Sequence, residues 1–284
     1  MKKIILINIM MGIILFSQSF ASYAPMILNA RSAGLGEAYI ALSDDFGALY
    51  YNPAGLIFLK GINIGFTHLE LPNSWTRVEY IGGIINLDKF SIGLGVSLKG
   101  ISNPDELLFP FSENSYQISL ASKILPNLSL GGTFYLYQST LDTGKAFGFG
   151  EDLGVIYELN PLFRVGAVFY NPISRLSWST GEVEGVERKD LKVGGLLNLS
   201  FLKVPLKILC DISLLPKPQF INRINIGTEI NPIPLLFIRT GYNGEKESIS
   251  FGLGVKFSQF NLDYAFLYSE GLSNQHLLSL SAEF

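Results

Sequence analysis

The sequence predicts an all-β fold, a fourteen-stranded antiparallel transmembrane β-barrel, on three observations. From about residue 61 to the C-terminus, apolar residues recur at every second position, as in strands that have one face in an apolar medium. The connections between these segments alternate between very short turns and longer polar stretches, which is typical of membrane-spanning barrels. The composition agrees, because 48% of the 284 residues are apolar and only 16% are charged, against roughly 25% in an average soluble domain.

Residues 1–21 have the features of a secretory signal peptide. Lys2 and Lys3 precede an apolar run over residues 4–16, and Ala21 ends a stretch with small residues at the expected cleavage site. The run of roughly 13 residues is too short to span about 30 Å of hydrocarbon as a helix. No cysteine follows the cleavage region, so a lipoprotein anchor is excluded.

The segment between the signal peptide and the barrel does not alternate and is expected to be a plug. Fourteen strands leave an open lumen unless something fills it, and this segment has a suitable size. Ser43 is expected to cap a short helix, whose N-terminus the carboxylates of Asp44 and Asp45 would stabilise. Asn52 and Pro53 are expected to end that helix.

The strands are clearest in segment 90–99, where apolar residues at even positions alternate with Gly, Ser and Lys at odd positions. A soluble β-sandwich also alternates, but here the polar faces are rich in glycine and small hydroxyls, which fits a crowded, water-containing lumen. An even number of strands places every short turn and the C-terminus on the periplasmic side. The expected strands cover residues 61–71, 75–86, 89–100, 115–125, 127–138, 151–159, 162–171, 189–201, 204–215, 221–231, 235–243, 247–257, 259–269 and 274–284.

The three longest connections, residues 102–114, 139–150 and 172–189, are expected to be external loops. Aromatic residues near the strand ends, Tyr137 and Tyr170 among them, are expected in the girdles that anchor a barrel in the lipid headgroups.

The chain ends on apolar residues at every second position, Leu278, Leu280, Ala282 and Phe284. A terminal phenylalanine in this pattern resembles the assembly signal of Gram-negative outer-membrane barrels. The resemblance implies an outer-membrane location, with outer-membrane lipids and the barrel assembly machinery as partners.

Charged residues fall on the lumen-facing register of the expected strands. Charges in a confined lumen are costly unless they are paired or wet, so Glu37, Asp44 and Asp45 of the plug are expected to pair with some lumen cations. The alternative, that all these charges only contact lumen water, stays open. The expected lumen cations are Arg77, Lys99, Lys123, Arg164, Lys192, Lys207, Arg223, Arg239 and Lys256, and the expected carboxylates are Glu79, Glu158, Asp211, Glu229 and Asp263.

The plug carries a motif that resembles a known family. The core Asn52-Pro53-Ala54, followed by Gly55 and preceded by the Asp44-Asp45 step, resembles the N-terminal hatch of the FadL long-chain fatty-acid transporter superfamily. It looks closest to the PorV/PorQ group, whose last hairpin the residues 263–266 and His276 also resemble. In the superfamily the hatch moves and the ligand leaves through a gap in the wall.

The resemblance and the periodicity together divide the chain into three parts. Residues 1–21 are expected to be the signal peptide, residues 22–60 the hatch inside the lumen, and residues 61–284 the transmembrane barrel.

Enzymatic and cofactor-dependent functions are not expected. The two histidines, His68 and His276, lie near one seam of the expected barrel, but no residue spacing there matches a lipase or protease motif. The single cysteine, Cys210, excludes a disulfide and every multi-cysteine metal site. Tyr39 stands where a dinucleotide fingerprint would need a third glycine. The net charge of −3, without a basic cluster, argues against a nucleic-acid partner.

The resemblance implies two functions of different classes. The first is a FadL-like passive conduit for hydrophobic small molecules. The second is a PorV-like membrane platform or shuttle that receives an exported protein. We rank transport slightly ahead and expect no catalytic residue, metal or cofactor.

Overall fold

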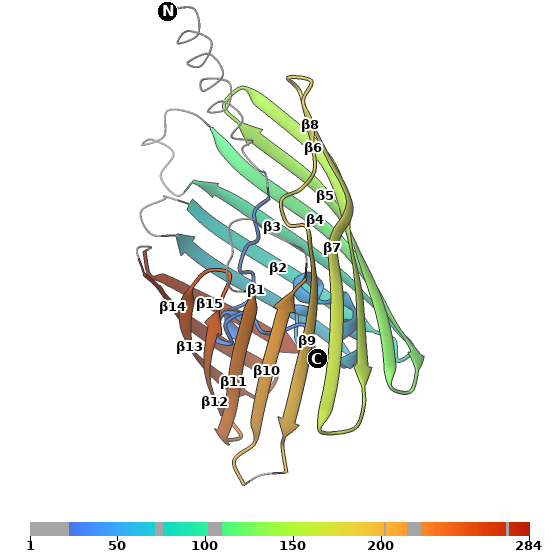
Figure 1. Ribbon diagram of the computed structural model, residues 1–284, viewed down its shortest axis with the longest axis vertical. Helices are drawn as coiled ribbons and strands as arrows, with labels where there is room; N and C mark the ends of the chain where they lie inside the picture. The colour runs from blue at the N-terminus through green and yellow to red at the C-terminus, as the bar shows by residue number, and fades with distance from the viewer. Residues whose placement is uncertain (1–22, 72–75, 102–109, 202, 215–222, 271–272) are drawn as a thin grey trace, which may run out of the picture.

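The wall of the molecule is a closed antiparallel β-barrel (Figure 1). The computed structural model describes residues 23–71, 76–101, 110–201, 203–214, 223–270 and 273–284. In this part of the chain fourteen long strands form the ring, in which β1 (Ile62–Leu71) pairs with β15 (Gln275–Glu283). The predicted fold class is therefore confirmed, whereas the predicted signal peptide lies outside the described residues.

Each long strand is hydrogen-bonded to both of its neighbours in the ring, and the pairing of β6 with β7 completes it. The other long strands are β2 (Thr76–Asn86), β3 (Phe90–Ile101), β4 (Phe111–Leu125), β5 (Leu128–Leu141), β6 (Gly144–Glu158), β7 (Phe163–Trp178), β9 (Asp190–Leu199), β10 (Leu206–Ser213), β11 (Ile224–Ile233), β12 (Leu236–Asn243), β13 (Ser248–Phe257) and β14 (Phe260–Ser269). The short strand β8 (Val183–Glu184) pairs only with β7.

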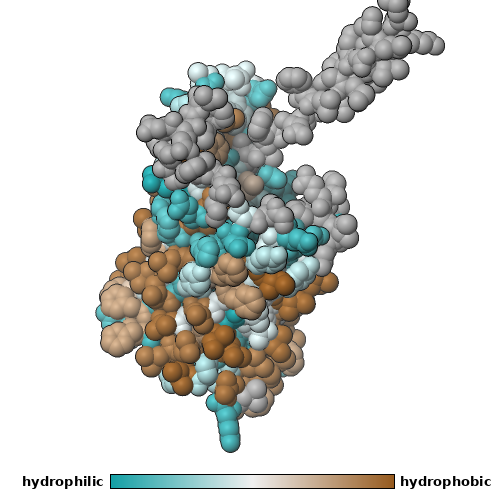
Figure 2. Space-filling model, turned by 90° about the vertical axis from the view of Figure 1, so that its left-hand side faces the viewer, coloured by the Kyte–Doolittle hydropathy of each residue, from teal (hydrophilic) through white to brown (hydrophobic). Residues whose placement is uncertain are grey.

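The two faces of the wall differ as the alternation predicts. In β13 the side chain of Phe251 on the outer face is 56% exposed, whereas Ser250 on the inner face is 1% exposed. Hydrophobic side chains form a broad band over the lower half of the face seen in Figure 2, and hydrophilic side chains gather above it. An outer face of this kind suits a hydrocarbon medium, while serines and glycines inside leave room in the lumen.

The two ends of the barrel carry different connections. We call the end with the short turns and the C-terminus the turn end, and the opposite end the loop end. At the turn end, Phe284 N donates to Ile62 O (2.8 Å) and Ile62 N donates to Phe284 O (2.9 Å), so the last residue helps to close the seam between β15 and β1. The assembly-signal role of Phe284 stays a prediction.

Strands β4 to β7 form a raised wall at the loop end (Figure 1). They have 14 to 16 residues, whereas β10 and β12 have 8 each. The expected external loop over residues 139–150 is therefore wrong, because all of these residues except the turn at 142–143 are the paired ends of β5 and β6. Residues 111–114 and 172–178, which were also expected in loops, belong to β4 and β7.

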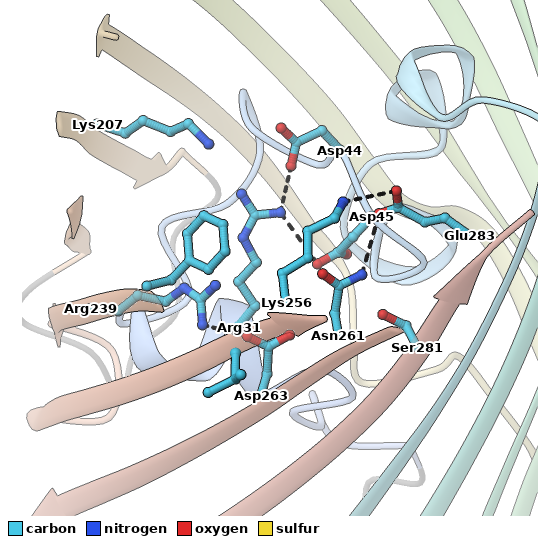
Figure 3. Close-up of a pocket in the computed structure, with 12 residues that line it drawn as sticks. Arg31, Asp44, Asp45, Lys207, Arg239, Lys256, Asn261, Asp263, Ser281 and Glu283 are labelled. Carbon is cyan, nitrogen blue, oxygen red and sulfur yellow. Dashed lines mark hydrogen bonds and ion pairs between the residues drawn. The ribbon is translucent and has the colours of Figure 1, made fainter. Parts of the chain in front are cut away.

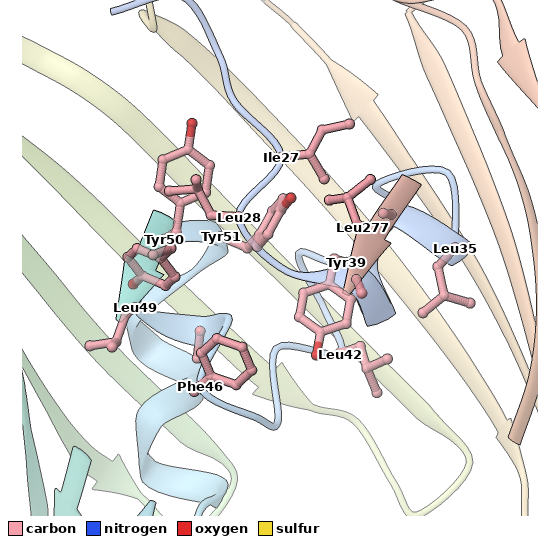
Figure 4. Packing of buried hydrophobic residues seen from close by; sticks show 14 of the residues in the cluster. Ile27, Leu28, Leu35, Tyr39, Leu42, Phe46, Leu49, Tyr50, Tyr51 and Leu277 are labelled. Carbon is pink, nitrogen blue, oxygen red and sulfur yellow. The ribbon is translucent and has the colours of Figure 1, made fainter. Parts of the chain in front are cut away.

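Residues 23–60, the inner segment, lie inside the barrel and are almost completely buried (Figure 1). They contain α2 (Ala30–Gly34), α3 (Ala48–Tyr51) and the 3-10 helix η1 (Pro53–Phe58). Leu35, Leu42, Phe46, Leu49 and other apolar side chains of this segment form the main hydrophobic core together with wall residues such as Leu277 (Figure 4). No helix in the described part of the chain is long and apolar enough to cross a membrane.

The expected helix cap at Ser43 is wrong by four residues, because the N-cap of α3 is Gly47. Ser43 has a positive φ of 26° and its hydroxyl donates to Tyr39 O (2.8 Å), so it ends the preceding turn instead of capping a helix. The carboxylate of Asp45 accepts from Gly47 N (2.7 Å), immediately before α3 begins. The expected end is correct, because Asn52 is the C-cap of α3.

Candidate functional site

Asn52 connects two helices of the inner segment and ties them to their surroundings. Its side-chain oxygen accepts from Ala54 N (3.1 Å), which caps η1, and its amide nitrogen donates to Ile40 O (2.9 Å). A second contact from the same nitrogen reaches Val155 O on β6 (3.3 Å). Pro53 occupies the first turn of η1, where its missing N–H costs no hydrogen bond.

Two glycines of the wall allow this motif to lie directly against the barrel. A Cβ atom at Gly131 on β5 would overlap the backbone of Pro53 and Ala54, and one at Gly154 on β6 would overlap the Asn52 side chain. Within the inner segment, a Cβ at Gly55 would collide with Ser43 O. The motif predicted from the sequence is thus a close contact between the inner segment and the raised wall.

Arg31 is the centre of an ion-pair network on the opposite side of the lumen (Figure 3). Its Nε and Nη2 donate to the two carboxylate oxygens of Glu229 on β11 (2.9 and 3.1 Å), and its Nη1 lies 2.7 Å from Asp44. Glu229 also pairs with Arg239 on β12 (2.7 Å) and Lys207 on β10 (2.8 Å). Paired in this way, Glu229 joins α2 to three strands while only 2% of it is exposed.

The protonation of the two aspartates follows from this network. Burial is the largest single influence on Asp44 and disfavours its charged form, but Arg31 and the more distant Lys207 and Arg164 together outweigh it and lower the pKa of this carboxyl. For Asp45, burial dominates over Arg31 and raises the pKa. Asp44 is therefore the stronger anionic partner of Arg31, and Asp45 acts mainly as a hydrogen-bond acceptor for Gly47 N.

A cavity of about 220 Å³ lies beside this network, between the inner segment and the wall toward the turn end (Figure 3). Its walls carry both signs of charge, and the charged groups pair with each other, as Arg239 does with Asp263 (2.5 Å) and Lys256 with Glu283 (3.0 Å). Such a lining suits water and small ions, because an apolar molecule would have to displace the solvation of these charges.

Two further contacts fix the inner segment to the wall. Asp211 on β10 accepts hydrogen bonds from the backbone N–H groups of Tyr39 (2.6 Å) and Ile40 (3.0 Å). Glu37 pairs with Lys246 in the turn between β12 and β13 (2.5 Å) and accepts from Asn243 (2.8 Å). These contacts are polar, and they are separate from the hydrogen bonds that join the wall strands to each other.

The expected pairing of plug carboxylates with wall cations holds only for Glu37. Asp44 and Asp45 pair instead with Arg31, which belongs to the same segment. The bridge to the wall has the opposite sense, since the cation is on the inner segment and the carboxylate, Glu229, is on β11. Sequence reasoning missed Arg31 because it lies outside the alternating strands, where no register predicts its neighbours.

Most of the other predicted lumen cations do point inward. Lys99 pairs with Glu113 (2.5 Å), Arg164 with Glu158 (2.7 Å) and Lys192 with Glu245 (3.4 Å).

Of the three remaining predicted cations, one lies on the outer face and two lie on the inward register. Arg77 is exposed and alternates with the inward residues Val78 and Tyr80, so it lies on the outer face, contrary to the expectation. Arg223 directly precedes β11 and shares the inward register of Asn225. Lys123 lies on the inward register near the turn end and is exposed.

Arg188, between β8 and β9, occupies the loop-end side of the lumen. Its Nη1 lies 2.7 Å from Asp152 on β6, and its Nη2 donates to Tyr50 O in α3. The guanidinium carbon lies 3.8 Å from the ring centroids of both Tyr50 and Tyr170. Sequence reasoning missed Arg188 because it read residues 172–189 as an external loop. Tyr170, which was expected in an aromatic girdle, points inward instead.

The histidines and carboxylates of the described residues are the candidates for catalytic or metal-binding chemistry. Among the described residues no group of three or more His, Cys, Asp or Glu side chains could hold a metal ion. His68 and His276 lie on the neighbouring strands β1 and β15, as expected, and bond to Glu79 (2.9 Å) and Tyr264 (2.7 Å) respectively. Pairings of this kind are ordinary for polar side chains on adjacent strands.

Solved structures with the same fold are transporters and channels by name. The toluene transporter TbuX of Ralstonia pickettii matches with a TM-score of 0.64 at 13% identity, covering 90% of this chain and 98% of that chain. The monoaromatic hydrocarbon channel CymD matches with a TM-score of 0.64 at 13% identity, covering 93% and 99%. A FadL homologue of Pseudomonas aeruginosa matches with a TM-score of 0.56 at 11% identity, covering 93% and 99%.

No family model matches the sequence, and no curated protein matches it. The solved structures share so few identical residues with this chain that they establish its fold and not its ligand. The fourteen-stranded wall described above therefore has the barrel fold of FadL-type hydrocarbon transporters.

Proposed function

We propose that the protein is a passive outer-membrane conduit for hydrophobic small molecules, closed at rest by the inner segment. The observation that carries this proposal is the way the lumen is filled. A segment with its own apolar core occupies the barrel, and polar contacts at Asn52, Arg31, Glu37 and Asp211 hold it to the wall. The segment is thus able to shift without breaking the hydrogen bonds of the wall strands.

The outer face and the fold support the membrane part of the proposal. Large apolar side chains such as Leu94 (60% exposed) and Phe251 (56% exposed) cover the outer face, which would be costly in water. Outer-membrane lipids and the barrel assembly machinery are the partners that such a barrel requires. The matched structures give no support to the alternative role as a platform for an exported protein.

Uptake of radiolabelled toluene tests the proposed function. Hydrocarbons cross plain bilayers unaided, so the assay must use cells with an intact lipopolysaccharide leaflet, with and without the full-length protein. We expect the protein to raise the initial rate of toluene uptake but not the uptake of a hydrophilic sugar. An unchanged rate of toluene uptake, with the protein correctly inserted, would refute a conduit for such molecules.

A disulfide between the inner segment and the wall tests whether uptake requires this segment to move. Ser279 Oγ accepts from Ala30 N (2.9 Å), so Ala30→Cys with Ser279→Cys, in a Cys210→Ala background, brings two thiols together between α2 and β15. We expect oxidation to abolish the added uptake and a reductant to restore it. Full uptake through the oxidised form would show that the inner segment does not move.

A further inference from the structure

We propose that residues 185–189, the strap, form a gate at the loop end of the lumen, and that Arg188 is the residue that holds this gate closed. The inference rests on the proposed function, to which it adds a second barrier besides the inner segment. The strap follows β8, crosses from the edge of the raised wall and ends at Asp190, where β9 begins (Figure 1).

The strap packs against the inner side of the raised wall. Val186 is 4% exposed and belongs to a small apolar cluster with Tyr135, Tyr137 and Leu176. Val186 N donates to Ser174 Oγ (3.1 Å), and Asn171 Nδ2 donates to Arg188 O (2.9 Å). Hydrogen bonding between β7 and β9 ends at the pair Tyr170 and Asp190. Beyond this pair, the strap covers a part of the lumen that the ladder between these two strands does not cover.

Arg188 joins three parts of the molecule at one point. It pairs with Asp152 on the wall and bonds to Tyr50 O of the inner segment, while its planar guanidinium lies between the rings of Tyr50 and Tyr170. Asp152 is fully buried and also accepts from Tyr135 OH (2.9 Å) and Asn171 N (3.0 Å). A shift of the inner segment would remove Tyr50, and with it one ring face and one acceptor, so movement of the segment and release of the strap are coupled.

The space at this joint is too small for a hydrocarbon. The cavity beside Arg188, which Tyr50, Tyr51 and Tyr170 also line, has a volume of about 30 Å³. A cavity that binds benzene measures about 150 Å³. An apolar molecule that reached the cluster around Tyr137 would therefore meet a closed layer at Arg188 and could pass only if the strap moved.

The interactions that close the gate are also reversible ones. A charged pair and two cation–π contacts have no covalent link, and their strength depends on exclusion of water. Once the strap lifts, water solvates both Arg188 and Asp152, which offsets part of the loss. The contacts of Arg188 can therefore break and form again as the strap moves.

A disulfide across the strap tests the proposal. A Cβ atom at Gly185 would lie 3.7 Å from Ser174 Oγ, so Ser174→Cys with Gly185→Cys, in a Cys210→Ala background, places two thiols within bonding range. We expect copper phenanthroline to reduce toluene uptake to the level of cells without the protein, and a reductant to restore it. Unchanged uptake after complete oxidation would overturn the gate.

Charge removal gives a second, independent test. The double variant Arg188→Gln with Asp152→Asn avoids an unpaired buried charge, and we expect it to take up toluene faster than the wild type. Arg175→Gln is the matched control, because Arg175 is exposed on β7, the strand paired with the β6 of Asp152, and its loss should leave uptake unchanged. A double variant that inserts and shows only the wild-type rate contradicts the role of Arg188.

The two proposals fail in different ways. If the wild-type protein carries no toluene at all, the proposed function is refuted. If the wild type carries toluene but neither the locked strap nor the double variant changes the rate, only the gate is refuted. Slower gel migration after heating than before serves as the fold control for each variant.

Discussion

At the scale of single residues, short polar side chains fix where the inner segment turns and where it touches the wall. Asn52 is the clearest case, because it ends α3, caps η1 and donates to Ile40 O while it is fully buried. Removal of its amide would leave Ala54 N and Ile40 O without this partner. An unsatisfied buried polar group costs about 1–3 kcal/mol.

Asn52→Ala should therefore loosen the inner segment without opening the wall. Ala48 in α3 is fully buried, so a cysteine there, in a Cys210→Ser background, reports local opening through its rate of maleimide labelling. We expect Asn52→Ala to raise this rate about 5- to 150-fold, as 1–3 kcal/mol implies. Asn261→Ala, at a half-buried position whose amide bonds to Glu283 on the wall, is the control, and equal labelling in the two variants would contradict the role of Asn52.

At the scale of elements, α2 is held to β11 by one buried carboxylate. Glu229 accepts from Arg31 with both oxygens and also pairs with Arg239 and Lys207. If Glu229 were neutral, the three cations Arg31, Arg239 and Lys207 would lose their common anionic partner. The loss of one partner from a buried pair costs about 3–5 kcal/mol, whereas an exposed pair is worth about 0–1 kcal/mol.

Glu229→Gln and Glu283→Gln make a matched comparison between a buried and an exposed carboxylate. Glu283 pairs with Lys256 and its side chain is 48% exposed, against 2% for Glu229. We expect Glu229→Gln to raise labelling of the cysteine at position 48 by about 100-fold or more, and Glu283→Gln to change it little. A similar rise in both variants would show that the network does not anchor α2.

Among the elements, most of the wall strands could be predicted from the sequence, whereas the β5–β6 hairpin could not. Wall strands have lipid on one side and the lumen on the other, so their period of two predicted fourteen strands and most inward cations. At residues 139–145 the hydroxyl and charged residues masked the outward alternation that continues through Phe147 and Phe149, so the β5–β6 hairpin was read as a loop.

The inner segment was only partly predictable for a physical reason. Its contacts depend on which wall residues meet it in three dimensions, and no periodicity encodes that. The motif at Asn52 was recognisable from its residues, whereas Arg31 and Arg188 carry no local signal for their partners Glu229 and Asp152.

At the scale of the whole molecule, the protein consists of a self-sufficient wall and an inner segment that fills it. Each wall strand satisfies its backbone hydrogen bonds with two neighbouring strands. The inner segment adds a core inside the lumen, and fourteen strands without it enclose an interior that side chains alone do not fill. The central claim is that residues 23–60 are what closes this barrel to solutes.

Conductance in planar bilayers tests that claim most directly, with the mature protein compared to the same chain lacking residues 23–60. Both forms should migrate faster in gels before heating than after it, which shows that each wall has folded. We predict that the intact protein is nearly silent and that the shortened chain forms stable, open, ion-conducting pores. A shortened barrel that folds and inserts but conducts no better than the intact protein would contradict the account.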